Sequence, residues 1–525
     1  MFIEEVLFHN AKPQRMHFWE RGNHFMKIGQ TVIAVALLGA VTDCSIIFDP
    51  QSNQCHVDAD CSKFSGHPTC EAGVCVDTGL GPEGCFGGTP TTQADYLNSC
   101  STSKCVKFDN CDRLGMNCNG TTTPLPATVD PSNPVIPPLV NPVNQPMVSC
   151  ASPGVNVIYL FGAADFAPLL QAVQPSLSAN NPPYRAVFQG SSSCNGVTSV
   201  FDSTKRLMKD PPPPAASGGW AFYFDDNGNQ VNCNLDSAGN TIDIGISDLY
   251  AQTCSPAFVP GATVAEYLGP VVPFVLSVPS TSSEQSISVE AAHMIFGSGG
   301  KAPAGLKDAS PWTDPTSYSI RNSGAASTVL TALLAEVPKT KFWGIDRLST
   351  DNLRDSLLAS TTASASIGIL SIDFNDKNRG NLRALYLQSK GQLCGYQPDS
   401  SPTTYDKSNV RDGHYPLWGY VHFFTPLGPG GVPSVAASAM VLRFRVPRLE
   451  QNLLDKVIAA SLVPACAMKV ARTTEVGDFS AKTGFECGCY FDFKTRNKTS
   501  CQTCNTSEDC PSDHSACNYG YCEAN

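Results

Sequence analysis

VNVIYLFGAADFAPLLQAV, residues 155–173, is the stretch that decides the fold we expect. It opens with a β-branched, apolar run, which predicts a short buried strand. From Phe166 onward the apolar residues recur at helical spacing, and Gly162 lies in the turn between strand and helix. A strand that leads directly into a helix is the building unit of layered α/β domains.

The same alternation of strand and helix continues along residues 150–485. We expect further strands at 186–188, 242–246, 273–278, 367–372 and 421–424, helices at 197–208, 288–296 and 327–336, and hairpin-type turns at 225–228 and 236–239. The sequence therefore predicts an α/β fold for this region.

Composition and charge restrict the classes of function. The chain has 525 residues, of which 42% are hydrophobic and 15% charged, so it is long enough for three or four domain-sized pieces with a sizeable core. Its net charge of -11 offers no basic surface for nucleic acid. Twenty-three cysteines are too many for a reducing cytosol unless they bind metal, and their spacing favours disulfides over zinc sites.

The N-terminal region carries features of an exported protein. A basic start at Met26 and the apolar run 32–41 are typical of a signal peptide, and the run is too short to span a bilayer. Cys44 follows at the position of the acylated cysteine of a bacterial lipoprotein, although Asp43 replaces the usual small residue. Setting Cys44 aside leaves 23 − 1 = 22 cysteines, enough for eleven disulfides. We expect export to the periplasm or cell surface, with Cys44 as a candidate lipid anchor.

A four-cysteine repeat occurs near both ends of the chain. Cys-x5-Cys-x8-Cys-x4-Cys begins at Cys55, and Cys-x5-Cys-x6-Cys-x4-Cys begins at Cys504. A unit of about twenty residues cannot build a hydrophobic core, so two disulfides must hold each copy. Their connectivity is left open by the sequence.

These features predict a division of the chain into five parts. They are a leader and signal peptide at 1–43 with the mature start near 44, a Cys-rich segment at 44–118, a Pro-rich linker at 119–148, a two-lobed domain at 149–485 with its second lobe at about 260–412, and a Cys-rich module at 486–525.

Three glycine-bearing turns before helices are candidates for ligand contact, at residues 161–166, 189–196 and 321–328. Small residues let a ligand approach the backbone, and a helix N-terminus offers free N–H donors and the positive end of its dipole. Arg321 could add a permanently charged, bidentate clamp. Together the turns predict a site for a dehydrated anion.

The order of short motifs over about 150–430 resembles the phosphate-binding periplasmic proteins of ABC transporters. The matching pieces are Gly162-Ala-x-x-Phe166-x-Pro168, Phe188-Gln-Gly190-x-x-Ser193, Ile244-Gly245-x-Ser247-Asp248, Val272-Pro-Phe-Val275, Ile295-Phe-Gly297, Trp312-Thr-Asp-Pro315, Ser319-Ile-Arg321-Asn-Ser-Gly324, Ser366-Ile-Gly368-Ile369 and Tyr415-Pro-Leu-x-Gly419-Tyr420. The resemblance implies a two-lobed type II periplasmic-binding fold with a hinge and a ligand between the lobes. The Cys-rich flanks lie outside the family pattern.

Carried over by position, the resemblance implies the following ligand-binding residues: Asp165, Phe166, Ser193, Asp248, Arg321, Ser323, Gly324, Ala325, Ala326 and Ser327. The chain departs from the family at three of them. Ser323 replaces the acceptor Asp of the family loop, Ala325 lacks a hydroxyl donor, and Asp165 stands where the family has Thr.

Asp165 can be interpreted in three ways. It could replace the missing acceptor and receive the proton of a monohydrogen oxyanion. Alternatively, Asp165 and Asp248 against Arg321 leave the cleft net negative, which favours a zwitterionic or neutral polar ligand because a buried uncompensated charge costs several kcal/mol. In the third interpretation Asp165 is an outward-facing helix cap.

The function we expect is an extracytoplasmic solute-binding protein for phosphate or a similar oxyanion, acting in ABC-type uptake or sensing as a monomer with a permease partner. The alternative is a surface interaction or adhesion protein that uses its Cys-rich modules. We expect no catalytic residues, metal or cofactor: His293 and His414 lie in settings typical of structural histidines, and no nucleophile-elbow or metalloprotease motif occurs.

Overall fold

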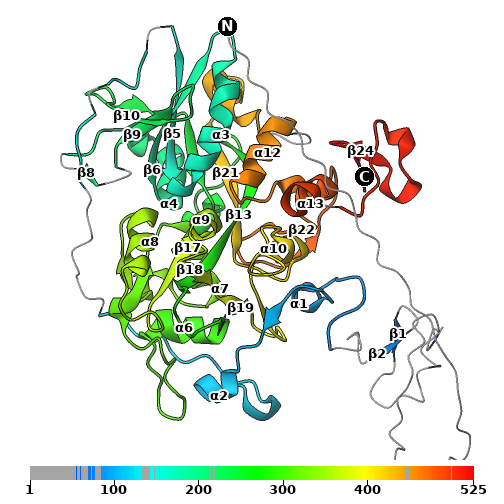
Figure 1. Cartoon of the computed structure of the whole chain (residues 1–525). Coiled ribbons are helices and arrows are strands. Elements are labelled where there is room, and N and C mark those ends of the chain that lie inside the picture. Colours follow the sequence, from blue (N-terminus) through cyan, green and yellow to red (C-terminus); the bar gives the residue numbers. More distant parts are fainter. Residues whose placement is uncertain are drawn as a thin grey trace, which may run out of the picture. The chain divides into compact units, whose positions relative to one another are not determined.

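The structure is a computed structural model, shown in Figure 1. It describes residues 84–524 apart from 133–141, 147, 153, 213–214, 217–218, 445–448 and 498, and before residue 84 only Cys55, Asp60, Thr69–Glu71 and Val74–Val76. The predicted signal peptide and Cys44 lie outside these residues. Within them, no helix combines the length and apolar character needed to cross a bilayer.

One eleven-stranded mixed sheet forms the framework, in the order β10-β9-β6-β5-β12-β21-β13-β17-β15-β16, with β18 also paired to β13. Its strands are β5 (Asn156–Ala163), β6 (Tyr184–Ser191), β9 (Ala221–Phe224), β10 (Gln230–Cys233), β12 (Ile244–Ser247), β13 (Val264–Pro279), β15 (Tyr318–Ile320), β16 (Ile345–Asp346), β17 (Ile367–Ser371), β18 (Leu382–Ala384) and β21 (Trp418–Pro426).

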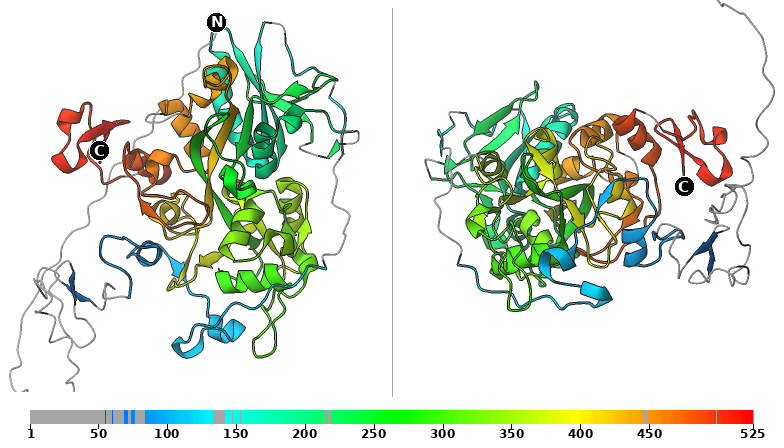
Figure 2. Two further views of the ribbon diagram at one scale, coloured as in Figure 1. Left: turned by 180° about the vertical axis from the view of Figure 1, so that it is seen from behind. Right: turned by 60° about the horizontal axis from the view of Figure 1, so that its bottom comes forward.

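Two long strands join the halves of this sheet. β13 pairs with β21 from Val264 to Pro273 and then with β17 from Phe274 onward, so it belongs to both halves. β5, β6 and β12 run parallel to one another in the first half, and β15, β16 and β17 do so in the second. Figure 2 shows the same arrangement from behind. The predicted α/β fold with two lobes is confirmed.

Helices that follow the parallel strands cover the sheet. In the first half these are α3 (Ala167–Ser178) and α4 (Ser193–Phe201); in the second they are α6 (Val289–Ser298), α7 (Ala326–Leu334), α8 (Thr350–Leu358) and α9 (Ile372–Lys377). α4 packs on β5 and β12, whereas α7 and α8 pack on β17. Each half therefore presents helix N-termini at the ends of its parallel strands.

The remaining elements are short. The helices are α1 (Gln93–Asn98), α2 (Asn110–Leu114), α5 (Ala251–Cys254), α10 (Ser408–Asp412), α11 (Val435–Val441), α12 (Gln451–Ala459) and α13 (Gly488–Arg496). The strands are β1 (Thr69–Glu71), β2 (Val74–Val76), β3 (Cys105–Val106), β4 (Pro142–Val143), β7 (Leu207–Met208), β8 (Ala215–Ala216), β11 (Asn240–Thr241), β14 (Ser286–Ser288), β19 (Tyr386–Gln388), β20 (Gly395–Tyr396), β22 (Val470–Ala471), β23 (Ser480–Ala481), β24 (Ala516–Asn518) and β25 (Tyr521–Glu523).

Two local predictions were wrong. The helix expected at 197–208 begins earlier, at Ser193, and ends at Phe201, because Asp202 leaves helical geometry and caps a short 3-10 turn instead. The turn at 225–228 does join paired strands, β9 and β10. The turn at 236–239 does not, because β10 pairs with β9 whereas β11 pairs with β7.

Nine disulfides join cysteines among the described residues. They are Cys85–Cys100, Cys105–Cys394, Cys111–Cys118, Cys150–Cys233, Cys194–Cys254, Cys466–Cys487, Cys489–Cys501, Cys504–Cys517 and Cys510–Cys522. Cys105–Cys394 ties the N-terminal Cys-rich segment to the second half of the fold, where β3 joins the sheet β14-β19-β20-β3. So many disulfides are typical of a protein that folds in an oxidising compartment.

The C-terminal copy of the cysteine repeat is a hairpin held by crossed disulfides. Its first cysteine pairs with its third (Cys504–Cys517) and its second with its fourth (Cys510–Cys522), which resolves the connectivity that the sequence left open. Cys517 lies opposite Cys522 in the β24–β25 ladder. The backbone of the N-terminal copy has the same register, with Cys70 opposite Cys75 in β1–β2.

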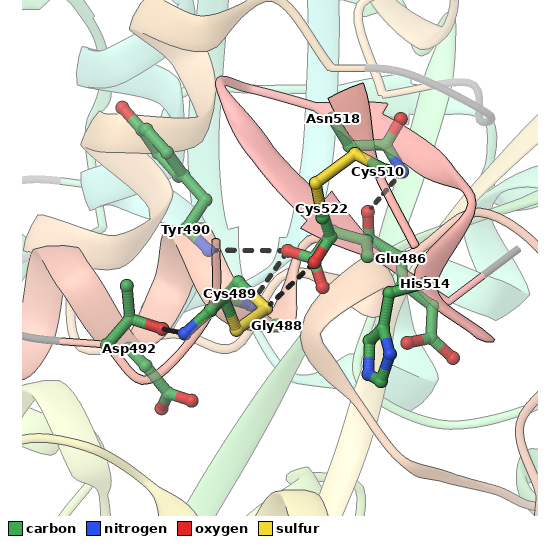
Figure 3. Close-up of a disulfide and its surroundings, with 12 residues drawn as sticks. Glu486, Gly488, Cys489, Tyr490, Asp492, Cys510, His514, Asn518 and Cys522 are labelled. Carbon is green, nitrogen blue, oxygen red and sulfur yellow. Dashed lines mark hydrogen bonds between the residues drawn. A yellow bond between two sulfur atoms is a disulfide. The ribbon is translucent and has the colours of Figure 1, made fainter. Parts of the chain in front are cut away.

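Glu523 binds the C-terminal hairpin to α13. Figure 3 shows Cys489 and Tyr490 of that helix beside the Cys510–Cys522 disulfide of the hairpin. The Glu523 carboxylate accepts hydrogen bonds from the amides of Cys489 at 2.7 Å and Tyr490 at 3.3 Å, in the first turn of that helix. Burial raises the pKa of Glu523 to about 7. The Asn518 side chain adds a bond to the carbonyl of Glu486 at 2.8 Å.

Three glycines allow α4 to approach the strands closely. A Cβ on Gly162 or on Gly196 would lie 2.0 Å from the carbonyl oxygen of Ile246, and a Cβ on Gly245 would lie 2.2 Å from that of Gly196. These contacts are with backbone atoms, which cannot move aside as a flexible side chain can. The glycines thus fix the position of the α4 N-terminus relative to the ends of β5 and β12.

We expect Gly196→Ala to destabilise the fold by about 3 kcal/mol, since overpacked cores lose roughly this much. Gly380→Ala is the matched control, because a Cβ there meets no atom within 4 Å. Thermal unfolding followed by circular dichroism measures both variants. Equal melting temperatures for the two variants would contradict the close approach of α4.

Candidate anion-binding site

A small cavity lies where the strand ends and helix N-termini of the two halves meet. Its volume is about 30 Å³. The lining residues are Ala163, Ala164, Asp165, Ser191, Ser192, Ser193, Asp248, Phe274, Arg321, Ala325, Ala326, Ser327, Thr350, Ile369 and Ser371. They come from the ends of β5, β6, β12, β15 and β17, from β13 and from the starts of α4, α7 and α8. The cavity is therefore polar, and both halves of the sheet contribute to it.

Arg321 is the principal charged group of the cavity. Its side chain follows β15 and only 7% of the residue is exposed. Nη1 donates to the Thr350 hydroxyl at 2.9 Å, whereas Nε has no hydrogen-bond partner. Among the ion pairs of the described residues none involves Arg321. Burial lowers the pKa of Arg321, but a guanidinium remains charged in proteins.

The N-termini of α4 and α7 both line the cavity. Each helix has nine residues, and the amides of a first helical turn have no acceptor within their own helix. Ser192 caps α4 by accepting a hydrogen bond from the amide of Asn195, while α7 has no side-chain cap. The amide of Cys194 donates to the carbonyl of Gly324 at 3.0 Å, which brings the two helix starts into direct contact. Both dipoles therefore favour negative charge at this point.

Asp165 and Asp248, which both line the cavity, form a carboxyl pair. Their side chains hydrogen bond to each other, which requires a proton on one of them. Burial raises the pKa of Asp165 to about 6 and, together with the charge of Asp165, raises the pKa of Asp248 well above its usual range. The Ser193 hydroxyl also donates to Asp248 Oδ2 at 3.3 Å.

The carboxyl pair changes the charge balance that the sequence left open. Above about pH 6 the pair keeps one proton and carries one negative charge, which Arg321 balances. The cavity is then neutral overall rather than net negative. Below pH 6 a second proton leaves it with one positive charge. A net negative cleft would disfavour an anionic ligand, but this cavity is not net negative because one of the two carboxyl groups keeps its proton.

Seven of the ten residues named from the sequence line this cavity: Asp165, Ser193, Asp248, Arg321, Ala325, Ala326 and Ser327. The other three are placed differently. Phe166 is buried, with its ring edge-on to Phe188 and Phe423. Ser323 is exposed, and Gly324 contributes its carbonyl to the contact with Cys194. The interpretation of Asp165 as an outward-facing cap is wrong, because Asp165 lines the cavity.

Sequence reasoning missed several lining residues. Thr350 binds Arg321, and Ser371 donates to Asp373 at 2.7 Å beside the cavity. The sequence does mark Thr350 as the start of a helix, because Ser349 before it is a typical N-cap residue. The hydrogen bond between Thr350 and Arg321, which are 29 residues apart, depends on the tertiary fold.

The two histidines considered from the sequence are structural. The ring nitrogens of His293 contact the carbonyl oxygens of Ala335 and Pro126, both at 2.8 Å. His414 Nε2 contacts the carbonyl of Ser99 at 2.8 Å. Neither lines the cavity.

Comparison with known proteins gives structural similarity alone. No family model and no curated sequence matches the chain. Among solved structures, a human phosphate binding apolipoprotein is 15% identical, with 58% of this chain and 90% of that chain covered and a TM-score of 0.39. An ABC-type phosphate transport receptor from Vibrio cholerae is 10% identical (59% and 100% covered, TM-score 0.37). A Corynebacterium glutamicum OxyR mutant is 8% identical (59% and 68% covered, TM-score 0.32).

We expect the stability of the ligand-free protein to fall as pH rises from 4 to 6. The reason is that folded Asp165, with a pKa near 6, keeps a proton that the unfolded chain releases near its usual value of 3.8. Asp165→Asn removes this titration, so its stability changes less over the same range. Melting temperatures at closely spaced pH values measure the difference.

The control is Asp226→Asn, which changes an exposed carboxylate in the turn between β9 and β10. This variant is expected to keep the pH dependence of the wild type. If Asp165→Asn kept it as well, the buried carboxyl pair would be disproved.

Proposed function

We propose that this chain is an extracytoplasmic receptor that captures phosphate, or a similar small oxyanion, in the cavity between its two halves. The observation that carries the proposal is the buried Arg321 guanidinium, which has no ion-pair partner among the described residues and an unpaired Nε at the cavity. Burying a charge without a direct ion-pair partner is costly. Asp165 acts on this guanidinium through its charge but forms no ion pair with it, and a bound anion would supply the direct contact and the missing acceptor.

The backbone around Arg321 supports an oxyanion rather than a lone halide. The Ser193 amide at the start of α4, the first-turn amides of α7 and the hydroxyl of Ser327 offer donors from two sides. A tetrahedral oxyanion has several oxygens to accept from donors that converge in this way. Arg321 can bind two of those oxygens at once.

The carboxyl pair supports a protonated oxyanion at neutral pH. With Asp248 protonated and Asp165 ionised, Asp165 is an acceptor that faces the anion. Monohydrogen phosphate has an O–H to donate to it, whereas sulfate has none. In this role Asp165 supplies the acceptor that is missing at Ser323.

The cavity supports binding rather than catalysis. Its lining contains several serines, among them Ser193 and Ser327, but no histidine among the described residues to act as a base for them. Ser193 donates instead to Asp248. We infer that the ligand leaves the site unchanged.

The arrangement of the sheet supports capture by closure. β13 and β21 connect the two halves, so a small bend in them could separate the helix N-termini and admit a solute. Delivery to an ABC-type permease, a monomeric state and an anchor at Cys44 belong to the same proposal. The disulfides support an oxidising location.

Titration calorimetry with inorganic phosphate tests the proposal. We expect the wild type to bind and Arg321→Ala to lose at least about a hundredfold in affinity, because truncating one partner of a buried charge pair costs several kcal/mol. Arg185→Ala is the matched control, since Arg185 lies over the Tyr223 ring and does not line this cavity. Absence of phosphate binding, or tighter binding of a neutral amino acid, would overturn the proposal.

The pH dependence of sulfate binding provides an independent prediction. Sulfate keeps the same charge between pH 5 and pH 8, so a change in its affinity reports the protein's own protons. As pH rises through the pKa of Asp165 the cavity loses a proton, and sulfate affinity should fall by about tenfold per pH unit above it. Asp165→Asn should abolish this fall. A flat sulfate profile in the wild type would refute the role given to Asp165.

A further inference from the structure

A second, larger cavity opens directly beside the small one. Its volume is about 390 Å³, and the two cavities share Ala164 and Thr350 in their walls. The larger cavity lies between α3, β6, β9 and β10 of the first half and α8 and α9 of the second. We call the two the inner and the outer cavity. A ligand held by Arg321 in the inner cavity would thus have free space next to it.

The sizes of the cavities differ by more than tenfold, about 30 Å³ against 390 Å³. The inner cavity has room for a group of a few oxygen atoms. The outer cavity falls within the range of about 300–1,000 Å³ that small-molecule sites occupy. An inorganic oxyanion would leave the whole outer cavity to water.

Aromatic side chains form much of the outer wall. Phe188, Phe222 and Phe224 pack edge-to-face in series, with ring centroids 5.6 Å and 5.7 Å apart. Phe374 lines the cavity from α9, on the opposite half. Aromatic faces from two sides favour a flat or apolar group between them.

The charges of the outer cavity compensate one another. Lys377 pairs with the buried Asp373 at 3.3 Å, and Asp351 pairs with Arg354 at 2.8 Å. Lys377 is the cationic residue among those that line the outer cavity, and its pairing with Asp373 leaves no free cation there for a second anionic group. A diphosphate or other polyanion is therefore poorly suited to this space, whereas a neutral group fits it.

Amide side chains lie at the rim. Gln171 and Gln230 are both exposed and line the outer cavity, where they could hydrogen bond to polar atoms at the edge of a ring. This combination of aromatic walls and a few polar groups is the usual composition of sites for small organic ligands.

We propose that the ligand of this protein is a phosphate monoester of a ring-bearing alcohol rather than free phosphate. The inference rests on the proposed function: the phosphoryl group occupies the inner cavity on Arg321, and its organic substituent occupies the outer cavity between Phe374 and the Phe188–Phe222–Phe224 series. A monoester monoanion keeps three terminal oxygens for the inner cavity, and one of them carries the O–H that Asp165 would accept. Its ester oxygen points past Ala164 and Thr350 toward the outer one.

Calorimetry on the full chain with four probes tests this proposal: phenyl phosphate, inorganic phosphate, phenol and diphosphate. We expect phenyl phosphate to bind about tenfold more tightly than inorganic phosphate, because the ring leaves water for an aromatic wall. Diphosphate should bind more weakly than inorganic phosphate. Phenol alone should not bind measurably, since it lacks the charge that Arg321 requires.

Phe374→Ala tests which wall holds the ring. It should remove most of the difference between phenyl phosphate and inorganic phosphate, and thermal unfolding of the variant shows whether it is folded. Phe493→Ala is the matched control, because Phe493 is a partly exposed phenylalanine on α13 that lines neither cavity. It should leave the affinities for both probes unchanged.

The outcomes separate this inference from the proposed function. If inorganic phosphate binds and phenyl phosphate binds equally or less tightly, the ester proposal is wrong and the oxyanion receptor stands. If neither binds, both proposals fail. A preference for phenyl phosphate that persists in folded Phe374→Ala would also overturn the placement of the ring.

Discussion

A buried guanidinium without a direct ion-pair partner among the described residues is the constraint on which the rest of the site depends. Arg321 follows a strand in the second half of the sheet, and within the described part of the chain its side chain hydrogen bonds to Thr350. Another buried cation is compensated directly, because Lys407 contacts both Asp376 and Asp399, at 2.8 Å and 3.0 Å. The comparison makes Arg321 a candidate for a functional rather than a stabilising role.

The fold places three further features around this charge. The glycine contacts of α4 set its N-terminus against β5 and β12, and the bond from Cys194 to Gly324 joins it to the start of α7. Asp165 and Asp248 then share a proton beside these helix starts. Each feature alone is common in α/β proteins. Their convergence on one cavity is the basis of the selectivity that we propose for the site.

Local chemistry made much of this predictable. The strand, turn and helix at 155–173 follow from periodicity alone, because each element is amphipathic over its own length. Site residues in turns were also predictable, since Arg321 and Ser193 stand beside glycine-bearing helix starts. In contrast, β13 extends from Val264 although only 273–278 has a strand-like pattern, because a register shift between Leu268 and Val271 interrupts the alternation. Thr350, the outer cavity and the shared proton depend on distances between remote segments, which no local pattern encodes.

The disulfide between Cys194 and Cys254 has a consequence for when the protein becomes competent. Cys194 is the second residue of α4, and Cys254 ends the short helix that follows Asp248. The bond therefore fixes the first turn of α4 at the cavity to the segment that carries Asp248. A chain in a reducing compartment lacks this constraint. If the cavity binds an oxyanion as proposed, its affinity then depends on the oxidation of this disulfide.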